Sequence, residues 1–96
     1  MKNWYVVNTH SHSEHKAALH LQRQGFKVYL PVYLKKRSHA RKVDWIHTPI
    51  FSRYLFVWVD ILKDRWTTIR STVGVGGILC QGGVPVSVPE EIIEQI

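Results

Sequence analysis

The chain has 96 residues, 45% of them hydrophobic, which is enough for one small core and too few for two folded units. Thirteen Lys and Arg against seven Asp and Glu give a net charge of +6, which favours nucleic acid over a membrane surface as partner; a basic protein without an anionic partner is the alternative. The lone cysteine excludes an intrachain disulfide, and the sequence has neither a membrane span nor a signal peptide. We therefore expect one cytoplasmic domain over residues 1–96, without membrane contact.

The first quarter of the chain predicts a strand followed by a helix. Residues from Trp4 to Thr9 are β-branched and aromatic and predict the strand. Ser11 and Glu14 have the spacing of a capping box for a helix that runs to about Gln24, where Gly25 supplies the left-handed residue after the last turn. The helix has an apolar side, Ala17, Ala18 and Leu21, and an opposite basic side, His12, Lys16, His20 and Arg23. The basic side is either a solvated face or a phosphate-binding surface.

Three histidines near the start of this helix, His10, His12 and His15, are metal-ligand types in a tight cluster. A zinc site is the weaker interpretation, because the run crosses a strand end and a helix cap without a nearby cysteine or a fourth ligand. We expect no metal there.

Residues 26–34 predict a second strand, with Phe26, Val28 and Leu30 inward and an edge or a bend at Pro31. The next segment, KKRSHARK, predicts the tip of a β-hairpin that projects five cations, Lys35, Lys36, Arg37, Arg41 and Lys42. Such a tip either follows phosphates or keeps the protein in solution, and the sequence does not decide between the two.

The stretch Pro49–Asp60, PIFSRYLFVWVD, alternates with period two. As a strand it places Tyr54, Phe56 and Trp58 on one face and three aliphatic residues, Leu55, Val57 and Val59, on the other. Neither face is polar, so both must be covered. The aromatic face is either an internal layer or an exposed surface for a partner.

The remaining elements are short. Asp60 predicts the cap of a helix with Leu62, Trp66 and Ile69 inward. The pair Gly82-Gly83 predicts a tight hairpin turn.

After that hairpin, Pro89 predicts the first turn of a helix with the apolar stripe Ile92, Ile93 and Ile96. This helix ends without a C-cap, which favours a longer natural protein over a short standalone one. The whole pattern predicts an α/β sandwich: a mainly antiparallel sheet of about four strands, flanked by helices, with a projecting basic hairpin.

Residues for catalysis are sparse. The glycines of VGVGGILCQGG lack the spacing of a dinucleotide fingerprint, and Cys80 has no evident histidine partner. The seven carboxylates offer no convincing acid/base pair. We therefore expect neither enzymatic activity nor a cofactor.

Five segments in order resemble the N-terminal domain of the NusG family of transcription elongation factors: WYVV, LQRQGFKVYLP, PIFSRYLFV, TTIRSTVGV, and GVPVSVP followed by a helix. The chain is most similar to the RfaH-like specialised antitermination paralogues. The order and spacing of the segments carry the resemblance, which covers nearly the whole chain. It implies a C-terminal KOW-type domain that is absent from this chain, with the ribosome or other factors as candidate partners.

The resemblance further implies that the chain binds RNA polymerase through an apolar patch that grips the clamp helices of the largest subunit. The matching positions are Phe51, Tyr54 and Phe56. Ile93 and Ile96 match positions that border this patch in RfaH-like members, in which a C-terminal domain masks the patch until recruitment.

A second implied contact faces the gate loop of the second-largest polymerase subunit. Arg65, Thr67 and Thr68 match it, although Arg65 replaces the histidine of the RfaH-like motif. Bridging clamp and gate loop would hold the polymerase closed and suppress pausing or termination, by biasing a conformational equilibrium.

The third implied surface binds the non-template DNA strand. The matching residues are His10, Lys16, His20, Arg23, Gln24, Arg70, Ser71 and Thr72. The cations would bind phosphates, whereas Arg23, Gln24 and Arg70 are the expected readers of base edges. Val73 stands where the family has an arginine, which implies weaker sequence specificity or a different DNA element.

Two other functions remain open from the sequence. A freestanding single-stranded RNA- or DNA-binding module would use Tyr54, Phe56 and Trp58 as a stacking platform. A small metal-dependent hydrolase would require bound metal in stoichiometric amount.

Overall fold

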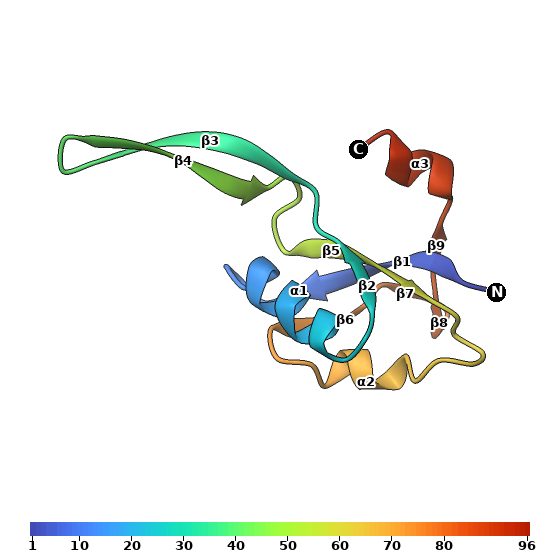
Figure 1. The fold of residues 1–96 in the computed structure, drawn as a ribbon. Helices are drawn as coiled ribbons and strands as arrows, with labels where there is room; N and C mark the ends of the chain where they lie inside the picture. The colour runs from blue at the N-terminus through green and yellow to red at the C-terminus, as the bar shows by residue number, and fades with distance from the viewer.

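The computed structural model describes residues 1–96 and is built around an antiparallel sheet (Figure 1). The strands follow the order β2 (Lys27–Tyr29), β5 (Tyr54–Val59), β1 (Asn3–Thr9) and β6 (Val75–Ile78). A fifth strand, β9 (Ser87–Val88), pairs with the first half of β1, on the edge whose second half pairs with β6. The predicted fold, a mainly antiparallel sheet flanked by helices, is confirmed.

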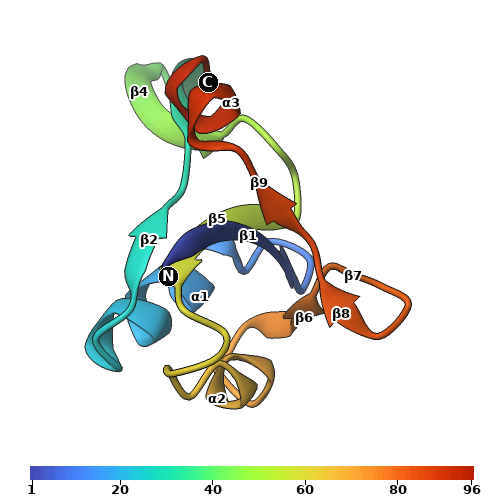
Figure 2. The same ribbon diagram turned by 90° about the vertical axis from the view of Figure 1, so that its right-hand side faces the viewer.

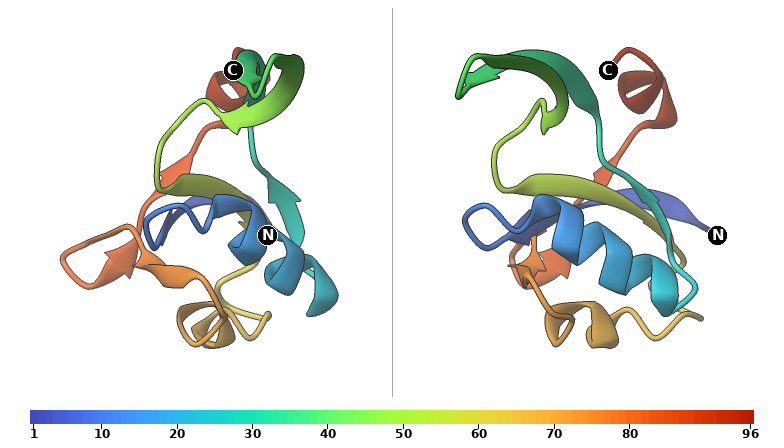
Figure 3. Two further views of the ribbon diagram at one scale, coloured as in Figure 1. Left: turned by 90° about the vertical axis from the view of Figure 1, so that its left-hand side faces the viewer. Right: turned by 60° about the vertical axis from the view of Figure 1, so that its left-hand side comes forward.

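The core lies on the aliphatic face of the sheet. Leu55, Val57 and Val59 of β5 are fully buried there, as the period-two pattern predicts. Helix α1 (Glu14–Arg23) runs along this face, and α2 (Thr67–Arg70) lies beside it (Figure 3). Each helix contributes a fully buried aliphatic side chain, Leu21 from α1 and Ile69 from α2. This single layer of apolar contacts is the main source of the stability of the fold.

The two ends of α1 differ in how well the sequence predicts them. The C-terminal end is confirmed: Gly25 has a φ of +93°, its N–H donates to Gln22, and the N–H of Phe26 donates to Leu21, which is the hydrogen-bond pattern of a Schellman motif. The prediction of a capping box at the N-terminal end is wrong. The N-cap is Ser13 without a side-chain cap, and the Glu14 carboxylate instead accepts the backbone N–H of Arg53, with an N···O distance of 3.2 Å.

The predicted basic hairpin is confirmed. Strands β3 (Val32–His39) and β4 (Lys42–Pro49) form a separate two-stranded sheet of eight residue pairs. Ala40 and Arg41 make the turn with φ angles of +50° and +66°. The predicted strand over residues 26–34 is divided at Pro31 into β2 and the start of β3. Figure 1 shows the hairpin extending away from the central sheet.

The predicted strand Pro49–Asp60 is shorter than expected. Pro49 ends β4, residues 50–53 form a turn, and β5 begins only at Tyr54. Phe51 therefore lies in a turn and not in the strand. Arg53, with a φ of +68°, brings the chain into β5.

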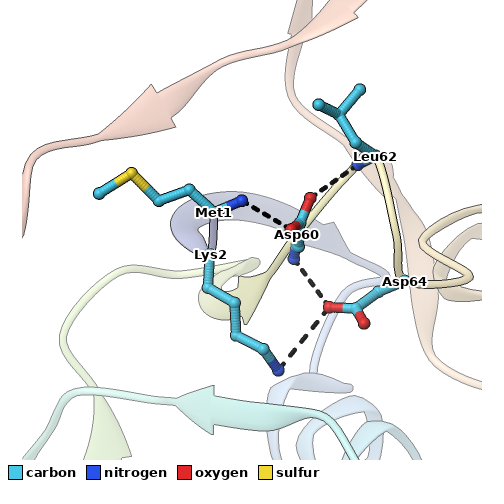
Figure 4. Close-up of polar contacts among 5 residues, drawn as sticks. All are labelled: Met1, Lys2, Asp60, Leu62 and Asp64. Carbon is cyan, nitrogen blue, oxygen red and sulfur yellow. Dashed lines mark hydrogen bonds and ion pairs between the residues drawn. The ribbon is translucent and has the colours of Figure 1, made fainter.

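The segment after β5 corrects the prediction for Leu62, whose side chain is 89% exposed. The Asp60 carboxylate accepts the N–H of Leu62 at 2.9 Å and the amino group of Met1 at 2.6 Å, while the N–H of Asp60 donates to the Asp64 carboxylate (Figure 4). These bonds fold residues 60–64 into turns, so α2 starts later, at Thr67. The hydrogen bond from the Met1 amino group is the largest cause that lowers the pKa of Asp60 below its usual value.

The last segment crosses to the aromatic face. Strands β7 (Cys80–Gln81) and β8 (Val84–Pro85) flank the Gly82-Gly83 turn, as predicted. Helix α3 (Glu90–Glu94) follows, with Pro89 as its N-cap. In Figure 2, α3 and the hairpin lie on one side of the central sheet and α1 and α2 on the other. No helix of the structure has both the length and the apolar character needed to cross a membrane.

Candidate binding surfaces

The aromatic face of the sheet carries a group of aromatic side chains, here called the aromatic surface: Trp4, Tyr29, Phe51, Tyr54, Phe56 and Trp58. Phe56 lies at its centre and is 6% exposed. The Tyr29 ring stacks beside it and the Phe51 ring meets it edge-on, each with a centroid distance of 6.2 Å. The register of β5 with both neighbours produces this group, because Phe56 pairs with Val6 of β1 and with Tyr29 of β2.

Helix α3 covers one end of the aromatic surface. The side chain of Ile93 is buried against Trp4 and Phe56, and the Tyr29 hydroxyl donates to the carbonyl oxygen of Ile96 at 3.1 Å. Ile92, which the sequence places on the same stripe, is about half exposed. Of the predicted stripe, Ile93 in α3 and Ile96 just after it pack against the aromatic surface.

The other end of the aromatic surface is open. Phe51 and Tyr54 are each 39% exposed, and Ile50 beside them is 44% exposed. The two interpretations of the aromatic face are thus both realised, one at each end. The burial of Phe56 argues against a three-ring stacking platform, because a base can stack only on an exposed ring and Phe56 is 6% exposed.

The position of Phe51 depends on hydrogen bonds from three separate elements. The N–H of Ile50 donates to Pro31, and the carbonyl of Arg53 accepts the N–H of Thr9, both at 2.8 Å. The buried Glu14 carboxylate accepts the N–H of Arg53. The turn over residues 50–53 is therefore fixed to α1, to β1 and to the base of the hairpin.

A second surface surrounds the start of α2. Arg65 and Thr67 are exposed, whereas the Thr68 hydroxyl donates to the carbonyl of Arg65 at 2.7 Å. The carbonyl of Thr68 accepts from the hydroxyls of Ser71 and Thr72. Arg65 and Thr67 are thus available to a partner, and Thr68 holds the surface together.

A third, basic surface runs along the outer side of α1. Lys16 and Arg23 are exposed and His20 is partly exposed. At the end of the helix, the Gln24 amide donates to the Thr72 hydroxyl at 2.6 Å, which connects the helix with the segment that follows α2. The Arg70 guanidinium lies 5.9 Å from the centre of the Trp66 ring.

Two of the residues predicted for nucleic-acid contact lie apart from this group or below its surface. His10 lies at the opposite end of α1, where its backbone N–H donates to Gly74. Thr72 is buried, so it supports Gln24 instead of reaching a base.

The close contact between Gly74 and α1 fixes this arrangement. Gly74 has a φ of +86°, and a Cβ added there would lie 3.1 Å from the backbone nitrogen of Ala17. Only a glycine satisfies both the backbone conformation and the space. The segment from Ser71 to Gly74 is thereby held against the helix that carries the basic residues.

The structure brings no three His, Cys, Asp or Glu side chains together in a way that could hold a metal ion. His10, His12 and His15 therefore do not form a ligand cluster. His15 instead contacts the carbonyl of His47 in β4 through Nε2 at 3.2 Å.

Three contributions are not predicted from the sequence: the places of Trp4 and Tyr29 in the aromatic surface, and the role of Glu14. The place of Tyr29 could have been predicted from alternation. Phe26, Val28 and Leu30 are assigned to the inward face of the strand, so Tyr29 belongs to the opposite face. The role of Glu14 could not have been predicted in this way, because its hydrogen-bond partner is 39 residues away in the sequence.

Comparisons with known proteins agree with this architecture. The family model described as "Transcription termination factor nusG" matches residues 2–96. The transcription termination/antitermination protein NusG of Halalkalibacterium halodurans is 29% identical, over 95% of this chain and 58% of its own. The corresponding protein of Bacillus subtilis is 29% identical, over 85% and 51%.

A solved structure that addresses domain interaction in Thermotoga maritima NusG superposes with a TM-score of 0.61 and 26% identity, over 95% of this chain and 52% of that one. The chain thus spans about half the length of these relatives.

Proposed function

The chain belongs to the NusG family of transcription termination and antitermination factors, and from that premise we propose that residues 1–96 form its polymerase-binding, N-terminal-type domain. The proposal rests on one observation above all: the aromatic surface is closed by α3 at one end and open at Phe51 and Tyr54 at the other. Exposed aromatic side chains held rigidly beside a packed core are typical anchors of protein interfaces.

We propose that the open end, Phe51 and Tyr54 with the buried Phe56 beneath them, receives the clamp helices of the largest polymerase subunit. A partner helix commonly binds by laying its apolar face against a hydrophobic surface of this kind. Ile93 and Ile96 border the same surface and set its extent. A C-terminal domain that masks this surface, as in RfaH-like proteins, forms part of the same proposal.

The second contact is assigned to the surface at the start of α2. Arg65 and Thr67 face solvent and are offered to the gate loop of the second-largest subunit. Thr68 acts indirectly, since its hydroxyl already bonds the carbonyl of Arg65. A domain that holds both subunits would favour the closed polymerase and oppose pausing or termination.

The basic surface is assigned to the non-template DNA strand. Lys16 and His20 would bind phosphates, and Arg23, Gln24 and Arg70 would read base edges. The Gln24 amide is oriented by Thr72, which gives that buried hydroxyl a positioning role. His10, at the far end of α1, would extend the phosphate path.

The specialisation is also part of the proposal. An RfaH-like role is supported by the basic side of α1 and by the threonines of α2. A KOW-type C-terminal domain would then recruit the ribosome or other factors. The protein would work in the cytoplasm, where bacterial transcription takes place.

The experiment that tests the proposal is a pull-down with an isolated clamp-helix fragment of the largest subunit. The parent chain is expected to be retained and Tyr54→Ala to be lost. Tyr33→Ala is the matched control, because Tyr33 is also a half-exposed tyrosine but lies on the hairpin. Retention of the Tyr54→Ala chain, or no retention of the parent, would contradict the proposal.

In vitro elongation on a template with pause and terminator sites then measures the activity. We expect shorter pauses with the parent chain and no change with the Tyr54→Ala chain. Unchanged pausing and termination with the parent chain would overturn the assigned function.

A further inference from the structure

The hairpin of β3 and β4 carries most of the net charge of the protein. Between residues 32 and 49 the sequence has five Lys and Arg and one carboxylate, Asp44, which gives +4 of the total +6. The remaining residues have eight cations and six carboxylates. The basic character of the chain is therefore concentrated in the one element that projects from its body.

These charges take little part in holding the fold together. Arg37 lies 3.4 Å from Asp44, and both side chains are more than half exposed. The other four cations, Lys35, Lys36, Arg41 and Lys42, make no ion pair. All four are exposed. Unpaired cations on an extended element are available to an anionic partner.

The register of the hairpin divides its side chains between two faces. Lys36 pairs directly with Trp45, which is 63% exposed, and the same face carries the exposed Leu34 and Val43. The opposite face carries Lys35, Arg37 and Lys42. Trp45 is thus a large aromatic ring in solvent with a cation beside it and more cations behind it.

We propose that this hairpin is a nucleic-acid-binding element separate from the basic surface of α1, in which Trp45 stacks on an unpaired base and Lys36, Arg41 and Lys42 bind phosphates. An exposed aromatic ring next to cations is how proteins hold single strands without reading their sequence. The hairpin is two strands wide, about 5 Å between strand axes, so lysines of the opposite face reach round its edges.

A lipid surface fits these residues less well. Trp45, Leu34 and Val43 would have to enter the membrane together, and Lys36 lies directly opposite Trp45 on that face. Its charge would be carried into the apolar layer. A nucleic-acid strand instead uses the ring and the cation at the same time.

The test is fluorescence anisotropy with a labelled, mixed-sequence single-stranded oligodeoxynucleotide and the 96-residue chain. Trp45→Ala is expected to weaken binding at least about fivefold, whereas Trp45→Phe keeps most of the affinity, because stacking needs a ring and not an indole. Equal affinity of the Trp45→Ala and parent chains would overturn the proposal. Trp45 is exposed and lies outside the core, so far-ultraviolet circular dichroism should show an unchanged fold for both variants.

The phosphate contacts are tested by the salt dependence of binding. The double variant Lys36→Gln, Lys42→Gln is expected to reduce the slope of log affinity against log salt concentration by about 1.4. Lys63→Gln removes an exposed, unpaired cation from the body and should leave the slope unchanged. Lys63→Gln removes one charge and the double variant removes two, so a slope reduction of about 0.7 with Lys63→Gln would show a response to net charge alone and contradict the proposal.

Further measurements distinguish DNA binding by the hairpin from DNA binding by α1, from lipid binding and from polymerase binding. Lys16→Gln with Arg23→Gln in α1 should weaken binding independently of the hairpin variants, so that the losses multiply. If Trp45→Ala abolished binding to phosphatidylglycerol vesicles and spared DNA, the element would be a lipid contact and the proposal would fall. Retention by the clamp-helix fragment should be the same for all hairpin variants, which keeps this proposal distinct from polymerase binding.

Discussion

The side-chain amide of Gln24 donates a hydrogen bond to the hydroxyl of Thr72 across 2.6 Å, and that hydroxyl in turn donates to the carbonyl of Thr68. This chain of bonds connects the C-terminal end of α1 with α2. Two of the surfaces described above, the basic one and the one around Arg65, are therefore parts of one rigid arrangement.

Replacing Thr72 by Val tests that connection. Valine fills the same space without the hydroxyl, and we expect the free energy of unfolding to fall by about 1 kcal/mol, because the Thr68 carbonyl loses a partner. Thr72→Ser keeps both bonds and is expected to cost less. Urea denaturation measures both values, and a Thr72→Val chain as stable as the parent would contradict the expectation.

The bond between Glu14 and Arg53 predicts a larger effect. Glu14→Ala removes a buried carboxylate that accepts the N–H of Arg53, and we expect a loss of about 1.5–3 kcal/mol, as for hydrogen bonds to charged groups. Ser13→Ala is the control, because the Ser13 side chain makes no cap hydrogen bond and only an exposed bond of 3.2 Å to the carbonyl of Ser11, so it should change stability by less than about 0.5 kcal/mol. Equal losses in urea denaturation would contradict the strength assigned to the bond between Glu14 and Arg53.

Replacing Gly74 tests the close packing of this residue against α1. Gly74→Ala brings a Cβ within 3.1 Å of the Ala17 backbone at a φ of +86°, so steric overlap and backbone strain add. Gly25→Ala meets the same kind of strain at +93° with nothing within 4 Å, and we expect it to cost about 1–2 kcal/mol. In thermal unfolding, the Gly74→Ala chain should have a clearly lower Tm than the Gly25→Ala chain. The reverse order would contradict the packing argument.

Local chemistry accounts for what the sequence predicts well. Alternation identifies the buried Leu55, Val57 and Val59 because the period of a strand is a property of the backbone alone. Gly25 and the Gly82-Gly83 pair are predicted for a similar reason, since a left-handed φ angle is required at those residues whatever lies around them.

Contacts between distant residues account for what the sequence does not predict. The spacing of Ser11 and Glu14 fits a capping box, but a backbone N–H far along the chain competes for the carboxylate. Asp60 is a residue type that often caps helices. In the structure it forms hydrogen bonds with the Met1 amino group and with Asp64 that stabilise a turn, and the side chain of Leu62 is therefore exposed to solvent. The half-closed state of the aromatic surface depends on α3, at the other end of the sequence.

The two ends of the aromatic surface predict different outcomes on truncation. Ile93→Ala empties a buried site between Trp4 and Phe56 and should lower the free energy of unfolding by about 2–4 kcal/mol. Phe51→Ala removes a ring that is more than one-third exposed, so it should cost less stability and more binding to the clamp-helix fragment. Urea denaturation and the pull-down measure the two effects separately. The same ranking of both variants in both assays would show that the two ends are not distinct.

The ion pair between Asp60 and the Met1 amino group predicts how stability changes with pH. The pKa of Asp60 is lowered in the folded chain, so its stabilising contribution is complete above about pH 4, the usual carboxyl range, and is lost as the pH falls through the lower folded value. The free energy of unfolding should therefore decrease steeply on acidification below about pH 4. Asp60→Asn should flatten this decrease and lower stability at pH 7, since an amide accepts from Leu62 but does not pair with an ammonium group.

Asp44→Asn provides the control for that measurement. Asp44 is more than half exposed and pairs only with Arg37 on the hairpin, so its replacement should leave the pH profile close to that of the parent. Urea denaturation between pH 7 and pH 2.5 gives the profiles of all three chains. If the Asp60→Asn and parent chains lost stability in parallel over that range, other carboxylates would carry the acid response and the ion pair between Asp60 and Met1 would not.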